Sequence, residues 1–308
     1  MSYNVLSAVL LLVLPLTFAR GCSARAKLDS AIGAAAVPAH DTLTRPLPDG
    51  IRLTADVYRQ RATGDEAMVG DKPVLVCMHM TSSSRGEYKR LAAELLALGV
   101  HVMSVDLRSG GPGEIADRKT GERSGTMNET WRQARALLGR DPTYIEAYPD
   151  VVAAVAWAKE LFPYSRIGLV GSSYSASLAL VYAAEHPSAV DVVAALSPGE
   201  YMQPWSIATR VKDLAVPTYF TCGNTQADMG QARPVAAAIL DQTKVRTFWP
   251  EDEGIIGDHG SRTLMIHGAV NHQRQWEKFR QGIAPVMRPL SAEELQRRRE
   301  ALAAPKKP

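Results

Sequence analysis

Four serines fall within residues 172–177, in the stretch RIGLVGSSYSASLAL. The apolar run before them predicts a strand, and the pattern after them predicts a helix from Ser173 to Glu185. In a parallel α/β sheet, ligands and chemistry collect at the carboxyl ends of the strands, which is where this junction would lie. A serine hydroxyl placed there could act as a nucleophile.

The neighbours of each serine single out Ser173. A side chain lifted out of so tight a turn needs small residues two positions before and after it, because the strand and helix backbones approach closely. For Ser173 these are Gly171 and Ser175, which fit. The flanks of Ser172 are a valine and a tyrosine, which are too bulky. Ser177, like Ser175, falls in the first turns of the helix, where a hydroxyl more often bonds back to the backbone.

The stretch GSSYS resembles the nucleophile elbow of the α/β-hydrolase family, usually written GxSxG, with Ser175 in place of the second glycine. A serine cluster that only caps a helix is the alternative interpretation. The family resemblance implies a fold with a mainly parallel sheet and a hydrolase mechanism with Ser173 as the nucleophile. Because a serine needs a base and the base needs a carboxylate, the other two members of a triad must follow along the chain.

The resemblance implies His259 as the base and Asp228 as the acid. His259 lies in Gly257–Ser261, which looks like the histidine loop of the family, and Asp228 follows the predicted strand 216–222. The spacing before Asp228 is longer than the family's habit, so this loop is expected to bulge. The alternative acids are Glu251, Asp252, Glu253 and Asp258. Other histidines are less suitable as the base. His40, His101 and His186 fall at the wrong strand ends, and His267 and His272 follow the histidine loop, where a surface or helix-packing role is expected.

Two backbone amides are expected to bind the oxyanion that forms during hydrolysis. One belongs to Tyr174, which follows the nucleophile at a helix N-terminus. The segment His79-Met80-Thr81 resembles the His-Gly segment of the family, which implies the Met80 amide as the second donor and His79 as a residue that orders the loop. The stretch VDLRSGGPG resembles an Asp-x-Arg-Gly segment, which implies loop-ordering roles for Asp106 and Arg108.

Alternating elements must position these residues. Residues 41–60 read as an antiparallel hairpin around Pro48-Asp49-Gly50. Further strands are predicted at 73–80, 100–107, 166–171, 190–196, 216–222 and 244–249, and helices at 88–98, 144–161, 173–185, 231–242 and 276–282. This order predicts a mainly parallel sheet of about eight strands, opened by the hairpin and covered by helices on both faces, and the resemblance implies that this is an α/β-hydrolase fold. Only about residues 197–211 are available after the strand at 190–196, so little or no lid is expected.

The ends of the chain differ from the middle. Residues 1–26 resemble an export signal, because Val5–Ala19 is an apolar run of roughly 15 residues, short for a membrane span. Gly21-Cys22 resembles a lipoprotein box that would anchor the protein through a lipid on Cys22, whereas Ala24-Arg25-Ala26 fits an ordinary secretory signal. An uncleaved anchor is a third possibility. The protein is therefore expected to be periplasmic, membrane-anchored as a lipoprotein, or secreted.

Three further segments complete the predicted organisation. Residues 27–39 are a linker, 40–287 form one hydrolase domain, and 288–308 are a charged tail that is peripheral or disordered. The chain of 308 residues has 46% hydrophobic residues, which suffices for one substantial core. The net charge of +3, with 35 basic and 32 acidic residues, does not indicate a nucleic-acid-binding surface. The three arginines at 297–299 are expected to lie on a solvated helix face.

No cofactor is implied, and the histidines lack the spacing of a metal motif such as HExxH. The remaining two cysteines, Cys77 and Cys222, end apolar runs and are expected to be free buried thiols.

The predicted reaction is hydrolysis of carboxylic esters, and the chain looks most like dienelactone-hydrolase-type and related serine esterases, although the former usually carry a cysteine nucleophile. The long segment 110–141 is expected to rim the pocket, and its mixed charge favours small or polar esters. The expected pocket residues are His79, Met127, Trp131, Tyr201 and Trp205. A peptidase or amidase of the same fold, and a catalytically silent binding protein, are the alternatives.

Overall fold

The structure is a computed structural model that describes residues 37–60, 72–113, 125–265 and 269–303. The predicted export signal, most of the predicted linker and His267 lie outside the described residues. In the part of the chain that is described, no helix is both long enough and apolar enough to cross a membrane.

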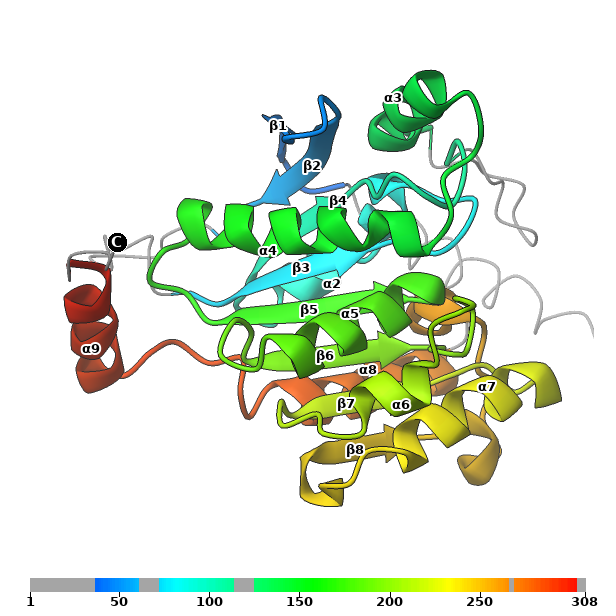
Figure 1. Cartoon of the computed structure of the whole chain (residues 1–308). Coiled ribbons are helices and arrows are strands. Elements are labelled where there is room, and N and C mark those ends of the chain that lie inside the picture. The colour runs from blue at the N-terminus through cyan, green and yellow to red at the C-terminus, as the bar shows by residue number, and fades with distance from the viewer. Residues whose placement is uncertain (1–36, 61–71, 114–124, 266–268, 304–308) are drawn as a thin grey trace, which may run out of the picture. The chain divides into compact units, whose positions relative to one another are not determined.

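The described residues contain one sheet of eight strands in the order β1-β2-β4-β3-β5-β6-β7-β8 (Figure 1). The strands are β1 (Asp41–Pro46), β2 (Arg52–Tyr58), β3 (Val74–Met78), β4 (His101–Val105), β5 (Ile167–Ser172), β6 (Val192–Leu196), β7 (Thr218–Thr221) and β8 (Val245–Phe248). β2 runs antiparallel to both β1 and β4, and the other neighbouring pairs are parallel. The predicted mainly parallel sheet with an antiparallel hairpin is confirmed.

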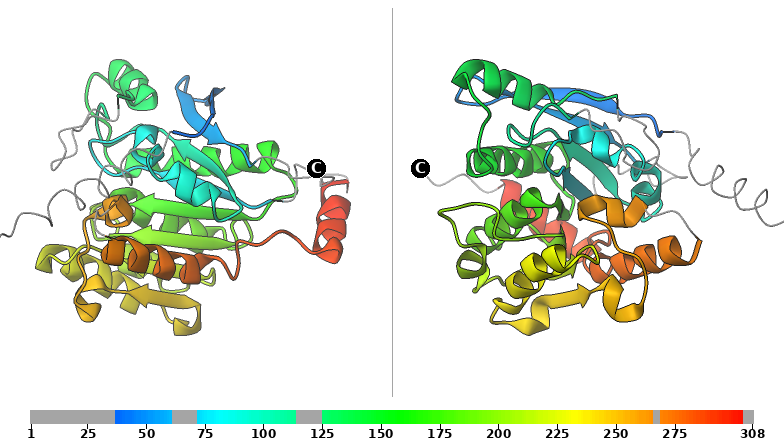
Figure 2. Two further views of the ribbon diagram at one scale, coloured as in Figure 1. Left: turned by 180° about the vertical axis from the view of Figure 1, so that it is seen from behind. Right: turned by 90° about the vertical axis from the view of Figure 1, so that its right-hand side faces the viewer.

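Helices cover both faces of this sheet, as the two views of Figure 2 show. One face carries α4 (Tyr148–Leu161), α5 (Tyr174–Glu185), α6 (Ile207–Val211) and α7 (Gln226–Ala237), and the other carries α2 (Ala92–Leu96) and α8 (Ala269–Ile283). The carboxyl ends of the parallel strands consequently open at one edge between the two helix layers, where loops are free to carry functional side chains.

Successive residues of a central strand pack into different cores. In β3, Val76 and Met78 belong to the core under α4 and α5, whereas Leu75 and Cys77 belong to the core under α2 and α8. This alternation follows from the period of two along a strand, and it explains why the strand reads as a continuous apolar run. Each such side chain contributes about 1.5–3 kcal/mol by burial.

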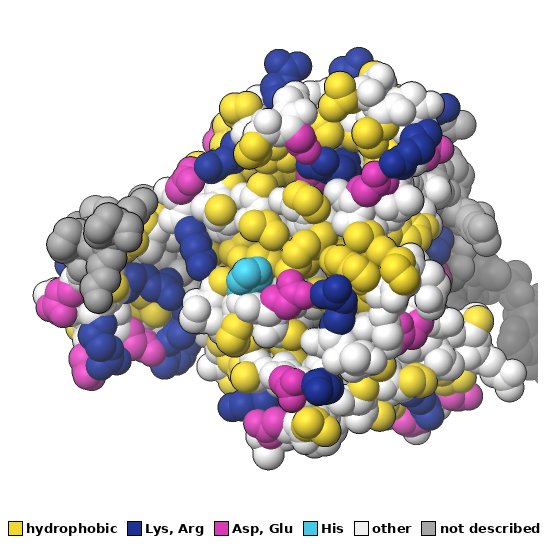
Figure 3. Space-filling view, viewed as in Figure 1, with side chains coloured by type: hydrophobic (Ala, Val, Ile, Leu, Met, Phe, Trp, Pro, Cys, Tyr) yellow, Lys and Arg dark blue, Asp and Glu magenta, His cyan; other side chains and the backbone are white. Residues whose placement is uncertain are grey.

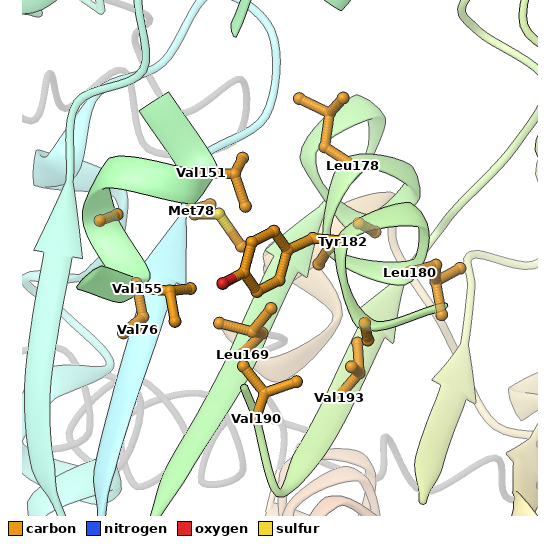
Figure 4. Close-up of a cluster of buried hydrophobic side chains, with 14 of the residues drawn as sticks. Val76, Met78, Val151, Val155, Leu169, Leu178, Leu180, Tyr182, Val190 and Val193 are labelled. Atoms are coloured by element: carbon orange, nitrogen blue, oxygen red, sulfur yellow. The ribbon is translucent and has the colours of Figure 1, made fainter. Parts of the chain in front are cut away.

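The core under α4 and α5 is shown in Figure 4. Tyr182 of α5 lies between Leu169 of β5 and the α4 residues Val151 and Val155. The packing fixes α5 against β5, so the turn between them has little freedom.

Both described cysteines, Cys77 and Cys222, are buried and free, as predicted.

Four helical segments differ from the sequence-based expectation. The predicted helix at 88–98 is a 3₁₀ turn, Arg85–Tyr88, followed by the short α2. The segment expected only to rim a pocket contains α3 (Glu129–Leu138), whose first turn is capped by the Asn128 side chain, which accepts the Trp131 N–H. α7 and α8 begin five and seven residues before the predicted helices at 231–242 and 276–282.

The charged tail contains a helix, α9 (Ala292–Ala303), none of whose residues is buried. Glu294 pairs with Arg166 and Arg288, and Arg298 donates to the Ser165 carbonyl. Arg297 pairs with Glu293 one turn earlier, so part of the basic run does form a solvated helix face. On the face shown in Figure 3, acidic and basic side chains are interspersed around a band of apolar groups.

Candidate active site

Ser173 occupies a strained turn between β5 and α5. Its backbone has φ 61° and ψ −124°, a conformation rarely adopted by a residue other than glycine, and its N–H donates to the Leu196 carbonyl at 2.8 Å. The tightness of the turn requires Gly171, because a Cβ there would lie 2.4 Å from Ala176 Cα. The hydroxyl of Ser173 is thereby held at the carboxyl edge of the sheet, at the N-terminus of α5.

The neighbouring serines bond back to the backbone, as predicted. Ser175 Oγ accepts the Ser172 N–H at 2.9 Å and lies 2.8 Å from the Met78 carbonyl, to which it donates. Ser177 Oγ donates to the Gly199 carbonyl at 2.8 Å. The hydroxymethyl group of Ser175 therefore fits the elbow without a glycine, and it ties the elbow to the end of β3.

The ring of His259 contacts Asp228. The distance from His259 Nδ1 to Asp228 Oδ1 is 2.5 Å, and the other carboxylate oxygen of Asp228 accepts the Gly223 N–H at 2.9 Å. Asp228 does not sit on a bulged loop, contrary to the expectation. Thr225 caps α7 by accepting the Asp228 N–H, so the acid lies in the first helical turn.

The alternative acids engage other groups. Glu253 pairs with Arg274, and Asp252 pairs with Arg233 on the surface. Asp258 accepts the adjacent His259 N–H at 2.7 Å, so it contacts the backbone of that histidine and not its ring. Among the described carboxylates, only Asp228 bonds the imidazole of His259.

The loop that carries His259 is seated on the ends of β5 and β6. The Gly260 N–H donates to Ser197 Oγ at 2.8 Å, and the Ser261 N–H donates to Ser172 Oγ at 2.9 Å. Gly260 has φ +64° and a Cβ there would lie 2.3 Å from Ser172 Oγ, so no side chain fits. His259 is thereby brought to the strand end that carries Ser173. No hydrogen bond joins the hydroxyl of Ser173 to His259 within the described residues.

Sequence reasoning missed Ser197, which follows β6 directly. Its backbone has φ 55°, and its hydroxyl lies 3.4 Å from Asp228 Oδ2 as well as accepting from Gly260. The signal available in the sequence was its position immediately after the buried strand β6. Ser197 links the strand end, the acid and the histidine loop.

His79 orders the loop after β3, as predicted. Its Nε2 accepts the Leu107 N–H at 2.9 Å, which leaves the proton on Nδ1 to donate to the Met80 carbonyl at 2.8 Å. Asn128 also lies 3.2 Å from Nε2. His79 is completely buried, so its predicted place in the substrate pocket is wrong.

The Met80 amide differs from the expectation of a free oxyanion donor. Its N–H donates to Glu87 Oε2 at 2.9 Å, so a carboxylate already occupies it. The Ser82 N–H donates to the Gly110 carbonyl. Between them, the Thr81 N–H has no acceptor among the described residues, and Thr81 lines a cavity. The contact of Met80 with Glu87 has no local signal in the sequence, because the two residues are seven positions apart and join only in the folded chain.

Asp106 and Arg108 hold the loop after β4, as the resemblance implied. Asp106 accepts from the Arg85 side chain at 2.6 Å and from the Glu129 N–H at 2.9 Å. Arg108 donates to Asp150 from Nε and Nη2 at 2.9 and 2.7 Å. Burial raises the pKa of Asp150 to about 6, against the opposing effect of the Arg108 guanidinium.

Residues 72–249 match the model of the family described as the alpha/beta hydrolase fold. This chain belongs to that family. The match covers more than half of the chain and includes the strained serine and the acid, and the strand order and the elbow agree with it. None of the curated proteins compared with the chain matches it.

Several solved α/β-hydrolases have a similar structure. An esterase from Pyrococcus furiosus is 16% identical with a TM-score of 0.55, over 81% of this chain and 93% of its own. A dienelactone hydrolase from Anabaena variabilis is 14% identical with a TM-score of 0.57, over 82% and 100%. Est1E from Butyrivibrio proteoclasticus is 15% identical with a TM-score of 0.53, over 79% and 99%. At these identities the likeness shows a shared fold.

Two cavities of this α/β-hydrolase meet at Tyr201. The smaller, about 450 Å³, is lined by Asp228 and His259, and the larger, about 1050 Å³, by Thr81 and Trp131. The expected pocket residues Trp131 and Tyr201 therefore do line a cavity. The other two do not line either one: Met127 contributes its carbonyl to Arg85, and Trp205 packs under Arg210.

The other described histidines have partners outside the proposed triad. His272 pairs with Glu94 at 2.7 Å, His101 Nδ1 accepts the Gln60 N–H at 3.0 Å, and His186 packs on Tyr182. Nowhere in the described ranges do three or more His, Cys, Asp or Glu side chains gather so that they could hold a metal ion.

Proposed function

We propose that the protein is a serine-dependent carboxylic ester hydrolase in which Ser173, His259 and Asp228 form the catalytic triad. The observation that carries this proposal is the strained Ser173 elbow beside the 2.5 Å contact of His259 with Asp228. Backbone strain of about 1–3 kcal/mol at a serine persists only where the surrounding structure enforces it, and such strain clusters at active sites. The family fold and the esterases of similar structure support the same reaction.

In the proposed mechanism, Asp228 stays ionised and accepts a hydrogen bond from the Nδ1–H of His259, which leaves Nε2 as the base. Ser173 Oγ attacks the ester carbonyl carbon while its proton moves to Nε2. The carbon–oxygen bond to the alcohol then breaks, and the alcohol leaves with that proton. Water attacks the resulting acyl group, gives a proton to Nε2, and the acid departs as Ser173 recovers the proton.

The oxyanion would be bound by the amides of Tyr174 and Thr81. Tyr174 is the first residue of α5, so its N–H has no acceptor within the helix and the helix dipole favours negative charge there. Thr81 replaces Met80 in this role, because the Met80 amide is held by Glu87. Each such donor contributes about 2.7–4 kcal/mol to transition-state stabilisation in hydrolases where it has been removed.

We propose small or polar esters as substrates. Mixed charge supports this choice, since Arg135, Arg140, Asp141 and Glu146 all line the larger cavity. Trp131 and Tyr201 supply apolar surface there. A long alkyl chain would gain little binding free energy beside four charged side chains. A short or polar acyl group would leave these side chains hydrated.

A panel of esters and peptides, assayed with the full chain, tests the function. We expect hydrolysis of short-chain p-nitrophenyl esters, which Ser173→Ala and His259→Ala each reduce to background. Glu251→Gln, which changes an exposed acid outside the proposed site, is the matched control and should keep full activity. Cleavage of peptides without ester hydrolysis would overturn the esterase assignment, and activity that survives Ser173→Ala would overturn the nucleophile.

A further inference from the structure

We propose that Glu87 is a positioning residue. It holds the oxyanion loop, which contains Met80 and Thr81, in a fixed position relative to the histidine loop, which contains His259 and Ser261. The inference rests on the proposed function, because it assigns a role within the same site. Glu87 lies in the 3₁₀ turn after β3 and is 8% exposed. Sequence motifs gave no hint of this role.

Each carboxylate oxygen of Glu87 bonds a different loop. Oε2 accepts the Met80 N–H at 2.9 Å, and Oε1 accepts the Ser261 hydroxyl at 2.5 Å. Met80 directly precedes the proposed oxyanion donor Thr81, and Ser261 is two residues beyond the proposed base His259. One side chain thus connects two loops, of which the histidine loop meets it at Ser261, 174 positions further along the chain.

The link continues to the nucleophile. The Ser261 N–H donates to Ser172 Oγ at 2.9 Å, and Ser172 precedes Ser173 in the elbow. Glu87, Ser261 and Ser172 therefore form a chain of buried contacts that ends at the residue before the proposed nucleophile. Because all these groups are buried, their hydrogen bonds lie in a low-dielectric environment that strengthens them.

The 3₁₀ turn keeps Glu87 in place. Ser84 Oγ accepts the Gly86 N–H at 3.1 Å, and the Glu87 N–H donates to the Ser84 carbonyl at 2.9 Å. The next residue, Tyr88, donates from its hydroxyl to the Met78 carbonyl at 3.0 Å. Since hydrogen bonds fix both neighbours of Glu87, its carboxylate has a well-defined position, and the two loops bind to it.

The consequence for catalysis is geometric. Without the carboxylate, each loop loses one of its anchors although the Gly260, Ser261 and Ser82 amides keep theirs, so the base and the oxyanion donor can move relative to the Ser173 hydroxyl. A displacement of about 1 Å in such a site costs on the order of 100-fold in rate. Substrate binding depends on the cavity walls and should change less, so the loss should appear in kcat rather than KM.

The test compares four variants of the full chain on an ester that wild type hydrolyses. Glu87→Ala is expected to lower kcat by about 10- to 100-fold with KM within about threefold. Glu87→Gln can still accept from Met80 and donate to Ser261, so it should recover most of the loss. Ser261→Ala frees only the histidine loop and should lose an intermediate amount. Glu94→Ala removes an exposed carboxylate paired with His272 and is the matched control.

A second readout is independent of turnover. The His259 Nδ1 proton, bonded to Asp228, should give a downfield proton NMR signal that His259→Gln abolishes. We expect Glu87→Ala and Ser261→Ala to shift or broaden it, and Glu94→Ala to leave it unchanged. If wild type hydrolyses no ester, the proposed function fails while this signal still tests Glu87. Folded Glu87→Ala or Ser261→Ala with wild-type kcat and an unchanged signal would overturn the positioning role.

Discussion

His259 Nδ1 lies 2.5 Å from Asp228 Oδ1, although the two residues are separated by 31 positions. The contact joins the loop after β8 to the first turn of α7. It fixes the imidazole so that Nε2 faces away from the carboxylate, which is the orientation a general base requires. Asp228 Oδ2 accepts the Gly223 N–H, so a backbone hydrogen bond fixes the position of the carboxylate that His259 contacts.

Replacing Asp228 with asparagine should remove the acceptor that selects the tautomer of His259. We expect Asp228→Asn to lower kcat by about 10³- to 10⁴-fold with little change in KM, as measured by steady-state ester hydrolysis. Asp258→Asn is the control, because its amide oxygen can still accept the His259 N–H. An equal loss in both variants would show that Asp258 shares the role assigned to Asp228.

The elbow should not tolerate a side chain at position 171. Gly171→Ala places a Cβ 2.4 Å from Ala176 Cα, so the strand and helix must separate. We expect unfolding to become easier by about 1–3 kcal/mol or more, measured by urea denaturation. Gly230→Ala is the matched control, because a Cβ there meets nothing within 4 Å and the helix should gain stability. Equal effects of the two substitutions would contradict the close approach.

The hydroxyl of Ser175 should stabilise the fold. Ser175→Ala leaves the buried Ser172 N–H without its acceptor, which costs about 1–3 kcal/mol. The midpoint of urea unfolding should fall accordingly, whereas the exposed Ser188→Ala should change stability by less than about 0.5 kcal/mol. A Ser175→Ala protein as stable as wild type would show that the hydroxyl has no such role.

The two buried thiols should be inert in the folded protein. Burial raises the pKa of Cys222 to about 12 and raises that of Cys77 as well, so almost no reactive thiolate exists at pH 8. In a Cys22→Ala chain, a thiol reagent should label no cysteine before unfolding and two afterwards. Labelling of either thiol in the native state, at the rate of a free thiol, would be the contrary result.

Local patterns sufficed for the fold and for the proposed triad. Gly171 and the serines around it mark a strand–turn–helix junction, and the central strands β3 to β7 are fully buried, which explains their apolar runs. Asp228 and His259 follow strands whose carboxyl ends share one edge. Their order along the chain, together with the family resemblance, was enough to select them from the other acids and histidines.

Other features depend on contacts between distant residues. Glu87 occupies an ordinary position beside Tyr88, and nothing local indicates that Met80 and Ser261 converge on it. The structure begins α7 before the predicted helix at 231–242, because the Thr225 side chain caps it by accepting the Asp228 N–H. Substrate-pocket residues were chosen by size and loop position, which do not determine the direction of a side chain.

The most direct test of the central claim is fluorophosphonate labelling of the folded full chain, followed by peptide mapping. An activated serine reacts with this probe because a base removes its proton, whereas an ordinary surface serine does not. We predict one adduct, on Ser173, that is lost in His259→Ala. A folded wild-type protein that takes up no label, or that carries it on another serine, would contradict the proposed triad.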